Sequence, residues 1–189
     1  MIQFYKPNAK VSGSACSFWM NSDGSVMASL IKQDSWNSAK KTGSFVKNKD
    51  NPKGRVIVKI SPTEVGGIMD TIESNRGFSA YHSSQNQVLQ IRFSAYTDKS
   101  SNEQKGFSFS VNKQDKSDTN NKVSFIIGFT FPEARYLKEY LAFVLNYIFE
   151  KKFQEAKFEK KDTSYKTKEA PPKPEEANVD EEDDSWDEW

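Results

Sequence analysis

In several apolar segments of this sequence, side chains that can bind a ligand lie an even number of positions apart. Arg55 and Lys59 alternate with branched apolar residues, and Arg92 and Tyr96 do the same further along the chain. Because successive side chains of a β-strand point to opposite faces, such a segment buries one set and presents the other. Guanidinium and ammonium groups bind phosphates, and aromatic rings stack on flat bases. The spacing therefore indicates a sheet face suited to a single-stranded nucleic acid.

Further candidates lie at strand ends and in polar segments. Trp36 sits in the polar stretch 33–41, where contact with a ligand and packing at a sheet edge are both open. The basic stretch 47–55 can follow a phosphate backbone or form a solvated loop. The candidate nucleic-acid-binding residues are Trp19, Lys32, Trp36, Lys47, Lys49, Lys53, Arg55, Lys59, Arg92, Tyr96, Lys105 and Lys113.

The residue types needed for catalysis or metal binding are scarce. His82 is the only histidine and Cys16 the only cysteine, so neither a disulfide nor a zinc site made of nitrogen and sulfur ligands can be assembled. We interpret Cys16 as a core residue and His82 as structural or solvent-facing. The sequence also has no phosphate-cradling G-x-x-x-x-G-K-[ST] segment. We therefore expect a protein that is not an enzyme, with no catalytic residue, no metal and no cofactor.

The elements that must position these residues follow one order twice. Asp23-Gly24 indicates a hairpin turn, while Ser61 with Glu64 and Thr130 with Glu133 are typical of helix starts. The first helix is expected to end near residue 74 and the second near residue 158, with an apolar stripe that forms core or an oligomer interface. The predicted strands are 13–20, 25–32, 43–48 and 55–60 before the first helix, and 77–83, 88–96, 106–113 and 122–129 before the second.

The predicted fold class is therefore α+β, a tandem ββββα repeat in which each antiparallel sheet is followed by its helix. An OB-fold would need about five strands, whereas the sequence predicts eight strands and two helices.

Charge divides the 189 residues into two opposed parts. Residues 169–189 hold ten acids and one base, which leaves 26 bases and 16 acids in residues 1–168. We expect residues 1–160 to form a nucleic-acid-binding domain, and 161–189 to form a flexible linker and a disordered acidic tail. The tail's candidate partner-binding residues are Asp183, Asp184, Trp186, Asp187, Glu188 and Trp189.

The order of elements resembles that of the Whirly family, and half of it resembles the positive-cofactor-four-type coactivator domain. The resemblance covers residues 13–158 and rests on the two equivalent helix starts and the basic, aromatic strands. It implies binding of single strands across the sheets, often by tetramers. The tail, acidic and ending in an aromatic residue, is similar to those of single-stranded DNA-binding proteins of bacteria and their phages.

The leading interpretation is a sequence-tolerant single-stranded DNA-binding protein of a phage or bacterium, acting in replication, recombination or repair. The tail would compete with DNA and recruit replication or repair proteins, and the chain would form a homo-oligomer, a dimer or a tetramer. An RNA-binding or transcription-linked module of the same fold is the second interpretation, and a DNA-mimicking protein-interaction factor is the third. Because no apolar stretch is long enough to span a bilayer, we expect no membrane partner and a cytoplasmic location in a bacterial or phage-infected cell.

Overall fold

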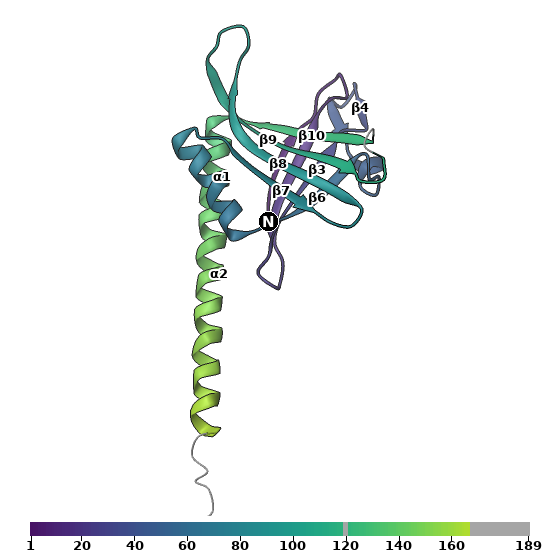
Figure 1. Cartoon of the computed structure of the whole chain (residues 1–189). Coiled ribbons are helices and arrows are strands. Elements are labelled where there is room, and N and C mark those ends of the chain that lie inside the picture. The colour runs from purple at the N-terminus through teal and green to yellow at the C-terminus, as the bar shows by residue number, and fades with distance from the viewer. Residues whose placement is uncertain (119–120, 167–189) are drawn as a thin grey trace, which may run out of the picture. The chain divides into compact units, whose positions relative to one another are not determined.

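The computed structural model describes residues 1–118 and 121–166, with side chains up to residue 157 (Figure 1). Its chain divides after Glu150, and the residues before that point form one compact unit. The first half contains β1 (Ile2–Lys6), β2 (Ser14–Met20), β3 (Val26–Lys32), β4 (Ser35–Asn37), β5 (Thr42–Ser44), β6 (Arg55–Ile60) and α1 (Pro62–Ser74). The second half contains β7 (Phe78–Ser83), β8 (Gln87–Thr97), β9 (Gln104–Asp115), β10 (Lys122–Phe129) and α2 (Phe131–Lys166).

Two four-stranded antiparallel sheets carry the fold. The first sheet has the order β1-β2-β3-β6, and the second sheet has the order β10-β9-β8-β7. Strands that follow one another in the sequence are neighbours in both sheets, apart from the step from β3 to β6, where the small β4–β5 hairpin intervenes. Each sheet is followed in the chain by its helix, so the predicted tandem ββββα repeat is confirmed.

One predicted strand of the first sheet is wrong. Residues 43–48 do not join that sheet, because Thr42–Ser44 pairs locally with Ser35–Asn37. The chain then turns into a short 3-10 helix, Val46–Asn48, whose Lys47 N–H donates to Asp34 Oδ2 at 2.8 Å. The place in the sheet belongs to β1, which pairs with β2 from Ile2 opposite Phe18 to Lys6 opposite Ser14.

The inner faces of the two sheets form one apolar core. Phe4 of β1 meets Phe129 of β10 edge to face with ring centroids 4.8 Å apart, and Phe18 of β2 lies 5.6 Å from Phe109 of β9. Cys16 is buried at 1% exposure, as predicted. Every second residue of each central strand therefore serves the core, which leaves the alternate residues for the outer faces.

Phe93 joins three other aromatic rings of this core. It is fully buried, and its ring centroid lies 5.9 Å from those of Phe107 and Phe129 and 6.2 Å from that of Phe109. Phe93→Ala is expected to lower the free energy of unfolding by about 3–5 kcal/mol, since it removes a buried ring and leaves a cavity. Guanidinium denaturation measures the change, with Ser79→Ala on the exposed face as the control. A loss below about 1 kcal/mol would contradict this arrangement of the core.

The helix starts follow from their sequence signals. Ser61 caps α1 in a reciprocal capping box with Glu64, and Pro62 occupies the first helical turn. Burial favours the neutral form of Glu64, but hydrogen bonds from the Ser61 N–H and from His82 outweigh it and lower the pKa of this carboxyl group. His82 Nε2 lies 2.6 Å from Glu64 Oε1, so His82 ties β7 to the start of α1. Of the two roles expected for His82, structural or solvent-facing, the structure shows the structural one.

The second helix starts as predicted and ends later. Glu133 accepts hydrogen bonds from both the N–H and the hydroxyl of Thr130, each at 2.8 Å. The helix was expected to end near residue 158, but it continues to Lys166. Glycine and proline are absent from residues 133 to 166, and glutamate, lysine and alanine favour a continued helix there. No helix in the described part of the chain is both long and apolar enough to cross a membrane.

Candidate nucleic-acid interface

The outer face of the second sheet carries the alternation that the sequence predicted. In β8, Leu89, Ile91 and Phe93 are buried. Gln90, Arg92, Ser94 and Tyr96 therefore share the opposite face, as expected. Arg92 lies between Ser79 of β7 and Ser110 of β9 in the strand register, so its guanidinium rises from a row of small hydroxyl side chains.

A tightly hydrogen-bonded loop places Lys53 beside this sheet. Asn48 Nδ2 donates to the carbonyl oxygen of Lys32 at 2.9 Å, and Asn51 Oδ1 accepts from the Lys53 N–H at 3.0 Å. Gly54 follows, and a Cβ atom there would lie only 2.2 Å from Asn48 Oδ1. Any larger residue at position 54 would displace Asn48, whose side chain ties this loop to the end of β3.

Lys32 and Lys113 are fixed at the ends of their strands. Lys32 Nζ lies 4.9 Å from the centroid of the Phe125 ring, a cation–π distance that joins the end of β3 to β10. Lys113 pairs with Val123 and with Leu89 in the register of the second sheet. Lys113 belongs to the inner face of β9, the same face as the buried Val111 two residues earlier. The core has ended at this point of the strand, so Lys113 is only half-buried. Both residues are half-buried beside β10.

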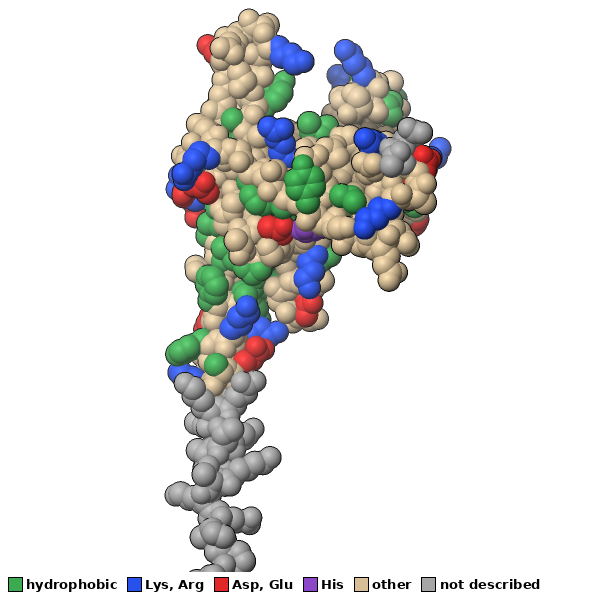
Figure 2. Space-filling view, in the orientation of Figure 1, with side chains coloured by type: hydrophobic (Ala, Val, Ile, Leu, Met, Phe, Trp, Pro, Cys, Tyr) green, Lys and Arg blue, Asp and Glu red, His purple; other side chains and the backbone are tan. Residues whose placement is uncertain are grey.

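Four shallow hollows connect these basic residues, because neighbouring hollows share lining residues. The first hollow, beside Arg92, shares Gln90 with the second, beside Lys122. The second shares Lys113 with the third, beside Asp115, and the third shares Lys53 with the fourth, beside Lys32. We call this surface the basic path and define it by the bases that line it in order, which are Arg92, Lys122, Lys113, Lys53 and Lys32. Figure 2 shows Lys and Arg side chains spread over the sheet part of the molecule, with uncharged side chains and backbone between them.

One acid lies on the basic path. Asp115 lines the hollow that also contains Lys53 and Lys113. The side-chain and backbone hydrogen bonds of Ser117 lower the pKa of this carboxyl group, and the charge of Lys113 lowers it further. Asp115 is therefore ionised at neutral pH. Counting the described residues, the lining of the basic path keeps a positive balance, with five bases against this one carboxylate.

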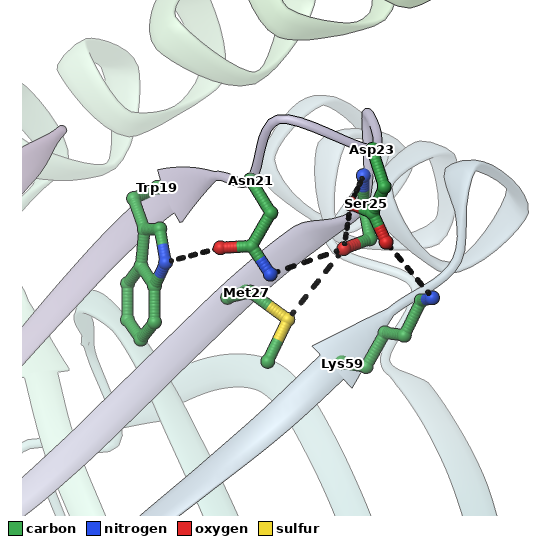
Figure 3. A network of polar contacts seen from close by, with 6 residues as sticks. All are labelled: Trp19, Asn21, Asp23, Ser25, Met27 and Lys59. Carbon is green, nitrogen blue, oxygen red and sulfur yellow. Dashed lines mark hydrogen bonds and ion pairs between the residues drawn. The ribbon is translucent and has the colours of Figure 1, made fainter.

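Two predicted residues lie together elsewhere, on the outer face of the first sheet. Trp19 and Lys59 flank Met27 in the strand register. The Trp19 indole N–H donates to Asn21 Oδ1 at 2.9 Å, and Lys59 Nζ lies 3.8 Å from Asp23 Oδ2 (Figure 3). Both side chains thus have partners within the β2–β3 hairpin, which anchor them at this end of the sheet.

Arg55 also has a structural task on the first sheet. Its Nε donates to the hydroxyl of the buried Ser29 at 3.0 Å, and its Nη1 donates to the Lys49 carbonyl oxygen at 3.2 Å. The guanidinium therefore fastens the loop that carries Lys53 to the sheet. Arg55 supports the basic path without lining it.

The other predicted residues are distributed around the molecule. Trp36 is half-buried in β4 opposite Gly43, and Lys47 and Lys49 are exposed at the 3-10 helix. Tyr96 lies at a register shift of β8, and Lys105 forms an ion pair with Glu103. The basic path thus brings together Lys32, Lys53, Arg92 and Lys113 from the predicted set, and it does not include the rest.

Several residues that line the hollows of the basic path, or extend its sheet face, were not predicted from the sequence. Tyr81 is 69% exposed on the outer face of β7, and Asn112 and Lys122 extend the same face across β9 and β10. The sequence carries a signal for Tyr81, because in a predicted strand it shares one face with the small polar residues Ser79 and Ser83. The predicted tail residues 183–189 lie outside the described part of the chain. Within that part, no cluster of three His, Cys, Asp or Glu side chains is placed to hold a metal ion.

Comparisons with known proteins match the fold and not the sequence. No family model and no curated protein matches this sequence. The plant transcriptional regulator PBF-2 is 14% identical, with a TM-score of 0.55 over 83% of this chain and 86% of that one. WHY3 from Arabidopsis thaliana is 14% identical, with a TM-score of 0.54 over 78% of this chain and 87% of that one. WHY1 from the same plant is 15% identical, with a TM-score of 0.53 over 92% of this chain and 96% of that one. The chain therefore has the fold of the Whirly proteins.

Proposed function

We propose that this protein binds single-stranded DNA along the basic path, with little dependence on sequence. The observation that carries the proposal is the convergence of five bases from well-separated segments on one line of shallow hollows. Ammonium and guanidinium groups spaced along a line can follow a phosphate backbone, whichever bases are attached to it. The fold that this chain shares with the Whirly proteins supports the same proposal of single-strand binding.

A single strand suits this surface better than a duplex does. Tyr81 is exposed among Ser, Asn and Gln side chains on the same sheet face, and a base can stack on it only when it is free of its complement. Stacking on an aromatic side chain contributes about 1–3 kcal/mol per base and tolerates any base. The hollows are shallow and lie on a sheet, whereas duplex readers insert a helix or a ribbon into a groove.

The role that fits such binding is to coat transient single strands in replication, recombination or repair, without catalysis, in a phage or bacterium. The acidic segment 169–189 adds a second task to this proposal. Its ten acids and one base can compete with DNA for the basic path, and its Trp186 and Trp189 can engage a replication or repair protein once DNA displaces the segment.

An RNA-binding or transcription-linked module is the second candidate function, because PBF-2, which shares the fold, is described as a transcriptional regulator. Binding of a fluorescent single-stranded DNA of about 30 nucleotides, followed by fluorescence anisotropy, separates the candidates. We expect saturable binding that unlabelled single-stranded DNA reverses and that duplex DNA reverses poorly. Stronger competition by the equivalent RNA would favour the second candidate. Absence of binding would contradict both and favour a protein partner.

We also propose that α2 joins copies of this chain into an oligomer. Three exposed aromatic residues share one face of the helix, Tyr136, Phe143 and Tyr147, with exposed fractions of 63%, 66% and 46%. Their spacing of seven and four residues is that of a helix–helix seam. A contiguous aromatic surface of this kind is typical of a protein interface.

Replacing Phe143 and Tyr147 together with glutamate is therefore expected to convert the oligomer into a monomer. Sedimentation velocity at micromolar concentration measures the mass of the assembly. The matched control is Asn146→Glu, which adds a charge to the exposed helix surface beside the seam. A monomeric starting protein, or an unchanged mass in the double variant, would contradict the proposed interface.

A further inference from the structure

A single row of polar side chains crosses all four strands of the second sheet. The strand register places Tyr81 of β7 opposite Gln90 of β8, Gln90 opposite Asn112 of β9, and Asn112 opposite Ser124 of β10. The four strands lie side by side in Figure 1. Neighbouring strands are about 4.8 Å apart, so the row presents a ring, two amides and a hydroxyl at nearly regular intervals.

Hydrogen bonds set the direction of the amides in this row. Gln90 Nε2 donates to the Tyr81 hydroxyl at 2.7 Å, and Asn112 Nδ2 donates to Gln90 Oε1 at 3.4 Å. Each amide keeps a second N–H, and Asn112 keeps its carbonyl oxygen as an acceptor. The row therefore offers adjacent donors and acceptors beside an exposed aromatic ring.

The same residues line one hollow of the basic path, of about 290 Å³. That volume lies just below the range of pockets that enclose whole drug-sized ligands, which suits a smaller group. Lys113 and Lys122 line the hollow as well, so a phosphate can be held beside it. Among the residues that the structure describes, no acidic side chain lines this hollow.

We propose that this row holds one base of the bound strand, stacked on Tyr81 and hydrogen-bonded by Gln90 and Asn112, and that it favours adenine. The inference rests on the proposed single-strand binding and adds a preference at one base position, while the rest of the basic path binds without regard to sequence. Asparagine and glutamine amides pair in two places with the N6 amino group and N7 of adenine. Without its complement, adenine offers an amide a donor beside an acceptor on two edges, N6 with N7 and N6 with N1, whereas cytosine and thymine each offer such a pair on one edge only.

Two oligonucleotides test the preference with the full-length chain. One is twelve thymidines, and the other carries a single adenosine at its centre in the same context. We expect the adenosine-containing strand to bind about 10-fold more tightly, the gain of one well-placed amide–adenine pair. Asn112→Ala and Gln90→Ala should each remove most of the difference between the two strands. Tyr81→Ala should weaken both strands by roughly 10-fold, through loss of stacking.

Ser110→Ala is the matched control, because it lies on the same face of β9 in the neighbouring row, opposite Arg92. It should keep the 10-fold preference. Equal binding of the two strands by the unaltered chain would overturn the inference while leaving single-strand binding intact. A central cytidine or guanosine that is preferred to adenosine would overturn it too, as would a preference that survives both amide variants. If neither strand binds at all, the proposed function itself fails.

Discussion

Replacing Lys53 and Lys113 together with glutamine is expected to weaken single-strand binding roughly 50-fold at about 50 mM salt. The two ammonium groups line the same hollow at the middle of the basic path, and they come from a loop and from the end of β9. Each phosphate contact to a single strand contributes about 0.7 to the slope of log affinity against log salt. The slope should therefore become shallower by about 1.4, and the two proteins should bind alike near 1 M salt.

A matched pair of lysines makes this result specific. Lys40 and Lys41 are exposed in the turn between β4 and β5 and do not line the basic path. Glutamine at both positions changes the net charge by the same amount, so only a general charge effect should remain. Equal losses in the two double variants would show that the overall positive charge, and not the basic path, holds the strand.

Deleting residues 169–189 is expected to tighten single-strand binding, on the order of 10-fold at low salt. The deletion removes ten acids and one base, whereas residues 1–168 keep 26 bases and 16 acids. An acidic segment tethered to a basic surface competes with the phosphates of DNA at a high local concentration. The gain should fade as salt rises, since the Debye length falls from about 10 Å at 0.1 M to about 3 Å at 1 M.

A second version of the segment separates charge from length. Changing its ten acids to the corresponding amides keeps the chain length and should tighten binding as much as the deletion does. Changing only Trp186 and Trp189 to alanine should leave DNA affinity as it is, because the competition is electrostatic. If the deletion leaves affinity at low salt unchanged, the acidic segment does not compete for the basic path.

Local patterns in the sequence predicted most of the fold. The alternation in β6 and β8 assigned their buried and exposed faces, and the Ser61–Glu64 and Thr130–Glu133 pairs located both helix starts. These features depend on residues a few positions apart. The order of the elements then indicated the repeat, because strands that follow one another in the sequence are neighbours in both sheets, apart from the step from β3 to β6.

The errors arose where distant residues decide the outcome. The segment ending at Asn48 looks like a strand, but the carboxylate of Asp34 holds the Lys47 N–H and turns the chain away. β1 was missed although its partner β2 was predicted, because only the folded sheet shows that residues 2–6 pair with β2. The same limit applied to the interface. Nothing local in the sequence shows that Lys32, Lys53 and Lys113 meet around β10, or that Trp19 and Lys59 lie on another face.

Photo-crosslinking of a bound thymidine oligonucleotide, followed by peptide mapping, tests the location of the interface most directly. The proposed function predicts crosslinks in peptides that contain Tyr81 and in those that contain residues 110–126, and it predicts that single-stranded competitor removes them. Crosslinks confined to Trp19 and the neighbouring outer face of the first sheet would contradict the basic path as the binding surface.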